Sequence, residues 1–246
     1  MKRFIINVCL FFFPVLLFSQ ADTLNQDYKN IQKMLSSKEP IIWLFTGNSI
    51  THGALHTNGF RSYSEHFAEL IRYEKRRMRD FVINTGISGA FVPELVNDFD
   101  HRIKRFYPGI VSVMIGMNDA GKGEKGRDTF RIYLSTLIDK IREIGAIPVL
   151  HTPNPVYPYH KSSEARKDLP NYTEIIRNLA AEKRIILVDH YRHWQETKKS
   201  DEELLLWIND RSIHPNEFGH REFAKLLFKS LGLFSKESPT CNLFVP

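Results

Sequence analysis

Five short apolar segments, separated by stretches with helical periodicity, most restrict what this chain of 246 residues can fold into. Each segment is rich in β-branched residues and ends in glycine, proline or a polar residue. Such near-continuous apolar runs are typical of parallel strands that are covered on both faces. The segments are residues 41–47, 81–86, 110–116, 147–153 and 185–190.

The stretches around these segments repeat apolar residues every three or four positions, as amphipathic helices do. The clearest stripe runs from Phe130 to Ile144, and Gly145 follows it as a typical C-terminal cap. The last stripe follows Pro215 and Asn216, which suit the beginning of a helix. The five stripes span residues 60–71, 95–106, 130–144, 172–179 and 223–231.

Alternation of strand and helix over the whole chain predicts an open parallel sheet with helices on both faces. We therefore expect an α/β fold with a five-stranded parallel sheet, in a single domain of residues 21–246. Its core is expected to cover about residues 41–234, and residues after Ser235 are expected to form a loose tail. In such sheets functional groups gather at the carboxyl ends of the strands, so reactive side chains are expected in the loops there.

Residues 1–20 have the pattern of a secretory signal peptide. Lys2 and Arg3 precede an apolar run from Phe4 to Phe18, and a small residue, Ser19, follows. The run is short for a membrane span, although an uncleaved anchor is the alternative. The pattern predicts an exported protein, periplasmic or secreted, with no stable membrane insertion after cleavage. Only Cys241 would then remain, which excludes an internal disulfide.

Two basic or histidine-containing stretches do not indicate a nucleic-acid or metal partner. The run of residues 73–80 lacks interleaved aromatic residues, and we interpret it as the solvated end of a helix. His52 and His56 are four residues apart, but no further ligand pattern accompanies them, so we interpret them as loop histidines. We expect no nucleic acid, no metal and no cofactor.

Four loops carry residues that together suit one reaction. "GNSITHG" places Ser49 after the first strand, "NTGISGA" places Gly89 after the second, and "GMNDA" places Asn118 after the third. "NDRSIHPNEFGH" supplies His214, with Asp210 nearby. Each residue alone is ordinary as a helix cap or turn residue. As a set they supply a hydroxyl nucleophile, an imidazole base and donors for an oxyanion, which are the parts of serine-based acyl transfer.

These blocks resemble those of the SGNH (GDSL-type) hydrolases, in the order Ser, Gly, Asn, His, over about residues 41–234. The resemblance implies a flavodoxin-like three-layer α/β/α sandwich and an exported, esterase-like bacterial member that needs no metal. It implies Ser49 as nucleophile and His214 as general base. It also implies an oxyanion hole made by the backbone N–H groups of Ser49 and Gly89 and the side-chain amide of Asn118.

The chain departs from the family pattern at three positions. Asn48 stands where the family usually has Asp, and Ala90 stands where many members have Asp. Arg211 stands three residues before the histidine, where the family places the orienting Asp, and Asp210 lies one residue further away. Either a bulge lets Asp210 orient His214 in a triad, or a backbone carbonyl does so in a Ser-His dyad.

The loops also suggest the class of substrate. The first three strands are followed by short loops without an apolar flap for a lipid tail. The long loop of residues 152–166 carries Tyr157 and Tyr159, whose rings either stack on a sugar or simply pack the loop. We therefore expect a serine esterase that hydrolyses acyl, most simply acetyl, esters of a carbohydrate. The alternatives are a lipid or thioester hydrolase on the same fold and a glycan-binding descendant with impaired catalysis.

Overall fold

The computed structural model of the chain describes residues 21–53, 55–209 and 213–246, so the expected signal peptide lies outside the described residues. Five strands form one parallel sheet in the order β2-β1-β3-β4-β5, as expected for a flavodoxin-like fold. The order reverses at β1, which lies between β2 and β3. The strands are β1 (Ile42–Gly47), β2 (Phe81–Asn84), β3 (Ile110–Met114), β4 (Ile147–Thr152) and β5 (Ile186–Asp189).

The apolar runs become central strands because both faces of the sheet are covered. Every residue of β3 and β4 is buried, and β1 is buried from Trp43 onward. The edge strand β2 is more open, and Phe81 at its start is exposed. Continuous apolar sequence therefore marks the strands between two helical layers, as the sequence pattern predicted.

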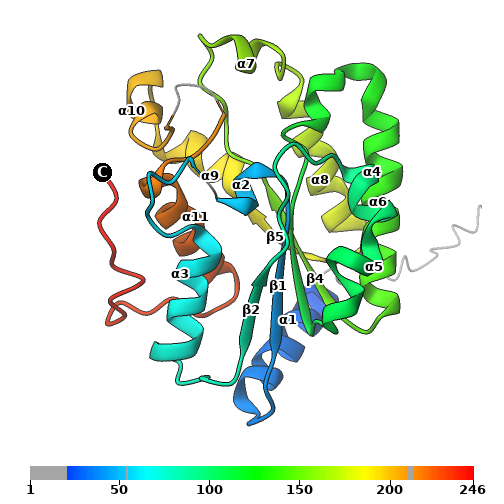
Figure 1. Cartoon of the computed structure of the whole chain (residues 1–246), viewed down its shortest axis with the longest axis vertical. Helices are drawn as coiled ribbons and strands as arrows, with labels where there is room; N and C mark the ends of the chain where they lie inside the picture. Colours follow the sequence, from blue (N-terminus) through cyan, green and yellow to red (C-terminus); the bar gives the residue numbers. More distant parts are fainter. Residues whose placement is uncertain (1–20, 54, 210–212) are drawn as a thin grey trace, which may run out of the picture.

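Helices cover both faces and complete the expected three-layer sandwich (Figure 1). α3 and α11 pack against each other on one face, while α4 packs on α6 and α6 on α8 on the other. The first face holds α3 (Tyr63–Glu69), its π-helical continuation Leu70–Glu74, and α11 (Glu217–Ser230). The second face holds α4 (Val92–Asn97), α5 (Phe99–Arg102), α6 (Arg127–Glu143) and α8 (Leu169–Glu182).

The helix expected over residues 95–106 is interrupted. It consists of α4, α5 and a 3₁₀ turn at Lys104–Phe106, with Asp98 at the first break in a non-helical conformation (ψ 23°). Leu95, Phe99 and Ile103 are nevertheless buried, so the apolar stripe was read correctly. Asn and Asp are weak helix formers, which allows the break at the Asn97–Asp98 pair.

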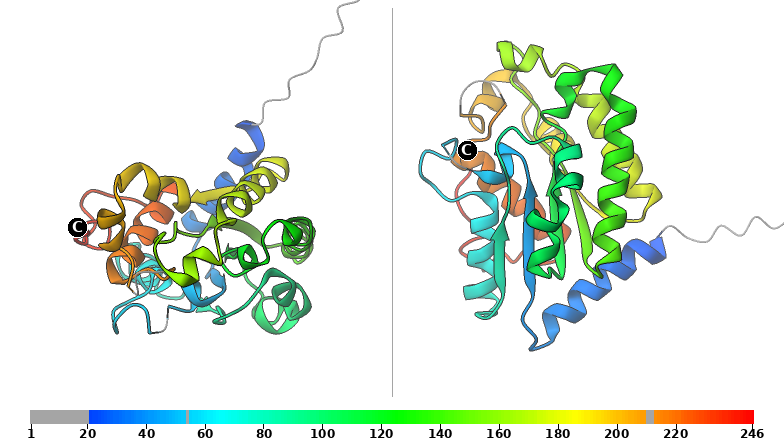
Figure 2. Two further views of the ribbon diagram at one scale, coloured as in Figure 1. Left: turned by 90° about the horizontal axis from the view of Figure 1, so that it is seen from above. Right: turned by 45° about the vertical axis from the view of Figure 1, so that its right-hand side comes forward.

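The helix α1 (Ala21–Ser36) was not among the predicted elements. It lies across the end of the sheet where the strands begin (Figure 2). Its Ile31 is buried, and the Gln32 side-chain amide donates to the Leu231 carbonyl at 2.8 Å. Asp27 forms an ion pair with Arg142 at the end of α6 (2.7 Å). The folded core therefore begins earlier in the chain than residue 41.

The expectation of a loose tail after Ser235 is wrong. Cys241 is buried, and the backbone N–H of Thr240 donates to the Glu74 carboxylate at 3.0 Å. The Pro246 carbonyl accepts from Lys198 Nζ at 2.8 Å and from Trp207 Nε1 at 2.9 Å. These contacts join segments far apart in sequence, so the local composition gave no sign of them.

The basic run of residues 73–80 was only partly interpreted correctly. Most of it is exposed, but the side chains of Arg77 and Asp80 are only 10% and 2% exposed and form an ion pair at 2.7 Å. Asp80 also accepts from the Ile41 backbone N–H and from Trp43 Nε1, both at 3.0 Å. Arg77 donates to the carbonyls of three residues that precede β1, namely Leu35, Ser37 and Glu39. The pair therefore joins the beginnings of β1 and β2.

Buried neutral histidines lie between the sheet and α11. His151 of β4 bonds Ser112 of β3 at 2.7 Å and His190 at 3.0 Å, while the backbone N–H of Tyr63 donates to Nδ1 of His220 at 3.2 Å. Burial lowers the pKa of His151 and of His220 to about 3. Histidines of the unfolded chain have pKa values near 6.5 and begin to bind protons at that pH. Both imidazoles are still neutral in the folded protein at the same pH.

These low pKa values predict loss of stability in mild acid. As the pH falls below about 6.5, the unfolded chain takes up protons that the folded protein does not bind, and this continues down to about pH 3. Each histidine then lowers the free energy of unfolding by about 1.4 kcal/mol per pH unit. Urea unfolding between pH 7 and pH 4.5 measures this slope. His151→Gln should flatten it by about one histidine's share, and His101→Gln, at an exposed site, should not. Equal slopes for the two variants would contradict the assignment.

Candidate active site

Ser49 lies on a tight bend at the carboxyl end of β1. A side chain at Gly47 would place its Cβ only 2.1 Å from the Met114 carbonyl oxygen, so only glycine allows this approach of β1 to β3. Asn48 caps the short helix α2 (Ser49–His52), its Oδ1 accepting the Ile50 backbone N–H at 3.1 Å. Asn48 is thus the N-terminal cap of α2, and Ser49 begins the helix.

The Ser49 hydroxyl contacts the imidazole of His214 across a sequence separation of 165 residues. The distance from Oγ to Nε2 is 3.0 Å, and the Ser49 residue is 8% exposed. This is the distance required for a base that takes the hydroxyl proton as the oxygen attacks. The structure therefore brings together the two residues that the sequence blocks singled out as nucleophile and base.

The segment that carries His214 is held on both sides. Ile208 and Pro215 form an isolated antiparallel bridge, and the backbone N–H of Asn209 donates to the His214 carbonyl at 2.9 Å. The side-chain amide of Asn154, in the loop after β4, donates to the Ile213 carbonyl at 3.1 Å. The expected orienting acid, Asp210, and its neighbour Arg211 lie outside the described residues, so the choice between triad and dyad stays a prediction.

His56 has a position that sequence reasoning missed. It lies in a loop, as expected, but its ring stacks on that of His214 with centroids 3.5 Å apart and planes 2° from parallel. Asn209 Nδ2 donates to the His56 carbonyl at 2.7 Å and joins the two loops. The stack restricts rotation of the His214 ring and covers one of its faces. The spacing of His52 and His56 could not indicate this ring stack, because the stack depends on how the loop that carries His56 folds against His214.

The loops after the first three strands are hydrogen-bonded to one another. The Ile87 N–H donates to the Gly47 carbonyl at 3.1 Å, and Gly89 follows in a turn with φ +87°. Asn118 Nδ2 donates to the Ala90 carbonyl at 3.1 Å. Gly89 and Asn118 are therefore fixed in loops adjacent to the one that begins with Gly47 and carries the serine.

A buried arginine holds the beginnings of two of these loops. Arg102 is 2% exposed, and its Nη2 donates to the Gly47 carbonyl at 2.7 Å and to the Thr85 carbonyl at 3.0 Å. Burial lowers the pKa of Arg102, although nearby Asp98 and Glu94 act in the opposite direction. The guanidinium joins the ends of β1 and β2, and so stabilises the bends that follow them.

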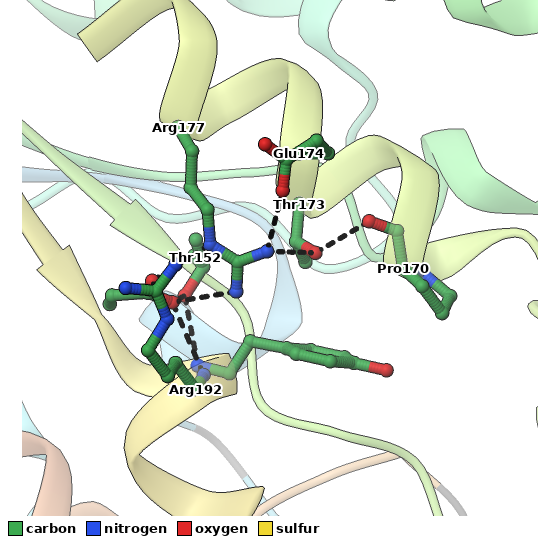
Figure 3. Close-up of polar contacts among 8 residues, drawn as sticks. Thr152, Pro170, Thr173, Glu174, Arg177 and Arg192 are labelled. Carbon is green, nitrogen blue, oxygen red and sulfur yellow. Dashed lines mark hydrogen bonds and ion pairs between the residues drawn. The ribbon is translucent and has the colours of Figure 1, made fainter. Parts of the chain in front are cut away.

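An ion-pair network fixes the carboxyl edge of the sheet where β4 and β5 end. Arg177 projects from α8 toward Thr152 and Arg192 (Figure 3), and its guanidinium pairs with Asp189 at 2.8 Å. Asp189 also accepts from Thr152 Oγ1 at 3.0 Å and from the Arg192 N–H at 3.2 Å. The second of these bonds caps the beginning of α9 (His190–Thr197). The network fixes the starting point of the long loop after β4.

The two tyrosines of that loop contact each other and α10 (Asp201–Leu205). The rings of Tyr157 and Tyr159 meet edge-on with centroids 5.5 Å apart, and Tyr159 is 77% exposed. A hydrogen bond to Asp201, together with its charge, raises the pKa of Tyr159. Contact of these rings with a sugar stays a prediction.

A cavity of about 680 Å³ begins beside the Asn118 loop. Phe91 and Phe130 give it apolar walls, and Lys122 and the buried Asp119 also line it. Asp119 Oδ1 accepts the Val92 N–H at 2.9 Å, yet burial raises the pKa of this carboxyl to about 6. Volumes of this size are typical of sites for small organic ligands.

Within the described ranges 21–53, 55–209 and 213–246, no cluster of three or more His, Cys, Asp or Glu residues could hold a metal ion. Over the same ranges, no helix is both long and apolar enough to cross a membrane.

A match to a protein-family model shows to which family this chain belongs. The model of the GDSL-like lipase/acylhydrolase family matches residues 45–222, which is more than half of the chain. The chain belongs to this family of acylhydrolases. Membership confirms the resemblance that the four sequence blocks indicated, and the matched range includes Ser49, Gly89, Asn118 and His214.

Characterised and uncharacterised proteins share parts of this GDSL-like sequence. An acetylxylan esterase of Geobacillus stearothermophilus is 26% identical over 211 residues, covering 77% of this chain and 93% of that protein. A probable rhamnogalacturonan acetylesterase of Bacillus subtilis is 32% identical over 142 residues, covering 51% of this chain and 64% of that protein. An uncharacterized Mycoplasma pneumoniae protein is 30% identical over 49% of this chain, but the match spans only 13% of its own length.

Solved structures show the same fold. A variant of an acetyl xylan esterase from Geobacillus stearothermophilus superposes with a TM-score of 0.68 at 22% identity, covering 82% of this chain and all (100%) of that one. An enzyme from the metagenome of Lake Arreo superposes with a TM-score of 0.64 at 19% identity, covering 80% and 99% of the two chains. The three-layer architecture is thus that of GDSL-like hydrolases.

Proposed function

We propose that this protein is a serine esterase that removes acetyl groups from a carbohydrate, with Ser49 as nucleophile and His214 as general base. The observation that carries the proposal is the 3.0 Å contact between Ser49 Oγ and His214 Nε2 at the carboxyl edge of the sheet. Membership in an acylhydrolase family gives this contact its chemical meaning. The sheet positions the serine because β1 ends at Gly47, two residues before it.

The reaction follows from these groups. His214 Nε2 takes the proton as Ser49 Oγ attacks the ester carbonyl carbon, and the carbonyl oxygen becomes an oxyanion. The N–H groups of Ser49 and Gly89 and the Asn118 amide stabilise that charge. Collapse of the intermediate breaks the carbon–oxygen bond, and His214 returns the proton to the leaving alcohol. Water then attacks the acetyl-Ser49 ester by the same route and releases acetate.

In this proposal Asp210 is the group that orients His214 and stabilises its protonated form. The stack of His56 on His214 supports the same orientation from the face of the ring. A dyad oriented by a backbone carbonyl is the alternative arrangement, and Asp210→Ala distinguishes the two by its effect on turnover.

Three observations support a carbohydrate rather than a lipid as the substrate. Two of the relatives are acetylesterases named for the polysaccharides xylan and rhamnogalacturonan. Leu55 and Ile87, in the loops that follow α2 and β2, are exposed, and no described segment covers them. Tyr159 in the loop after β4 offers an exposed aromatic ring of the kind that stacks on sugars. Export, predicted from residues 1–20, would give the enzyme access to polysaccharides outside the cytoplasm.

The test measures acetate release from acetylated xylan and acetylated rhamnogalacturonan, with the Ser49→Ala variant as the blank. A parallel series of p-nitrophenyl esters from acetate to laurate measures the preference for acyl length. We expect Ser49-dependent release from at least one polysaccharide and at least a roughly tenfold preference for acetate over laurate, since the exposed Leu55 and Ile87 are not covered by a described segment that could hold a long acyl chain. A preference for long acyl chains would favour the lipid hydrolase. Glycan binding without Ser49-dependent release would favour the binding protein.

A further inference from the structure

The amide of Asn118 has two fixed neighbours. On its nitrogen side, Nδ2 donates to the Ala90 carbonyl at 3.1 Å. On its oxygen side, Nη2 of Arg166 donates to Oδ1 at 3.3 Å, from a residue 48 positions further along the chain. Arg166 also donates from Nη1 to the Ser162 carbonyl at 2.8 Å, which ties it to the short helix α7 (Lys161–Glu164).

These two contacts decide which way the amide faces. A flipped amide would place its N–H₂ group against the guanidinium donors and its oxygen against the Ala90 carbonyl, so both contacts would become repulsive. The observed orientation uses one N–H of Nδ2 for Ala90 and leaves the second N–H for another acceptor. A donor that is held in place before the reaction loses nothing to reorganisation as the oxyanion forms.

The charge of Arg166 is not neutralised by a carboxylate of the described residues, unlike that of two neighbouring arginines. Arg127 and Arg177 pair with Asp168 and Asp189, whereas in the described part of the chain no carboxylate forms an ion pair with Arg166. Its Nε is buried and has no hydrogen-bond partner among the described residues. Burial also lowers the pKa of Arg166. A cation without a carboxylate partner is stabilised when negative charge develops near it during the reaction.

We propose that Arg166 is a positioning residue that fixes the Asn118 amide and strengthens it as a donor to the oxyanion. A cation on Oδ1 polarises the amide and makes the remaining N–H a better donor. This inference rests on the proposed esterase function and adds to it a residue outside the four sequence blocks. Arg166 therefore acts through Asn118 and has no direct contact with the reacting atoms.

The kinetic test uses Arg166→Met, which removes the charge, and Arg166→Lys, which keeps it without the planar fork. With p-nitrophenyl acetate, Arg166→Met should lower kcat roughly tenfold to 100-fold, less than the loss of a whole oxyanion donor, and change KM less than about twofold. Arg166→Lys should recover part of the loss. Lys167→Met is the matched control, because Lys167 is the adjacent cation, lies exposed and pairs only with Glu164 among the described residues.

A double variant separates positioning from a general structural effect. In an Asn118→Ala background, Arg166→Met should lower kcat less than about twofold, because the amide through which it acts is gone. An undiminished effect in that background, or an equal loss in Lys167→Met, would overturn the proposal. Thermal unfolding of each variant identifies any that fail to fold, in which case Arg166→Lys carries the comparison.

A second readout does not depend on catalysis. In ¹⁵N-labelled protein, the Asn118 side-chain amide gives a pair of NMR cross-peaks, identified by their loss in Asn118→Asp. Arg166→Met should shift these peaks and speed their exchange with water, and Lys167→Met should leave both unchanged. If the peaks respond but the wild type hydrolyses no acetyl ester, the esterase proposal fails and the positioning contact stands. If the wild type is active and neither peaks nor kcat respond, only the Arg166 proposal fails.

Discussion

The double variant Ser49→Ala/His214→Ala is expected to hydrolyse p-nitrophenyl acetate no more slowly than either single variant. Each single change should lower kcat by roughly 10⁴- to 10⁶-fold, because the hydroxyl and the imidazole act as one unit in the attack. The alanine at residue 49 removes the atom that attacks. The alanine at residue 214 leaves a hydroxyl with no base at the 3.0 Å position.

Non-additivity is the decisive part of this measurement. Steady-state kinetics on the wild type, both single variants and the double variant give the coupling directly. His101→Ala serves as control, because His101 is exposed and contacts Arg105 on the surface. If the two losses multiplied, Ser49 and His214 would act in separate steps and the mechanism proposed for them would be wrong.

Asp80→Ala is expected to lower the free energy of unfolding by about 3–5 kcal/mol, because it removes one partner of a buried ion pair. The change leaves the Arg77 guanidinium buried without the carboxylate that it contacts at 2.7 Å. It also removes the acceptor for the Ile41 N–H and for Trp43 Nε1. Urea unfolding at pH 7 measures the loss, and kcat at low denaturant should change little.

The matched control is Glu69→Ala, which breaks the exposed pair with Arg61. The two side chains of that pair are 35% and 56% exposed, so its loss should cost less than about 1 kcal/mol. The double variant Arg77→Met/Asp80→Leu replaces the buried pair with apolar groups and should recover part of the stability. Equal losses in Asp80→Ala and Glu69→Ala would show that burial of the pair adds nothing.

The strands were the most predictable part of the fold. Runs such as residues 110–116 and 147–153 are apolar at most positions because β3 and β4 have a helical layer on each face. The interruption at Asp98 was less predictable, since the apolar stripe continues through it. The packing of α1 and of the segment around Cys241 could not be predicted at all. Both depend on contacts with residues more than a hundred positions away, such as Gln32 with Leu231.

The site divides in a similar way. Ser49 and His214 could be paired from sequence because each lies in a distinctive block, and parallel topology brings strand ends to one edge. Asn118 was found for the same reason. His56 and Arg166 were not found, since their contacts with His214 and Asn118 depend on loop conformation rather than on local sequence. Sequence blocks thus indicated the groups proposed to react, and the structure adds the groups that hold them.

The Arg77–Asp80 pair and the serine loop lie at opposite ends of the same strands, because the pair contacts the beginnings of β1 and β2 while Ser49 follows the end of β1. Changes at sites that share no neighbours tend to have additive effects on stability. For protein engineering, this arrangement separates two tasks. Libraries that randomise exposed positions in the loops after β1 and β2, such as Leu55 and Ile87, would test whether these loops affect the preference for leaving group or acyl chain. Stabilising substitutions at the opposite end can then compensate for the stability that such variants lose.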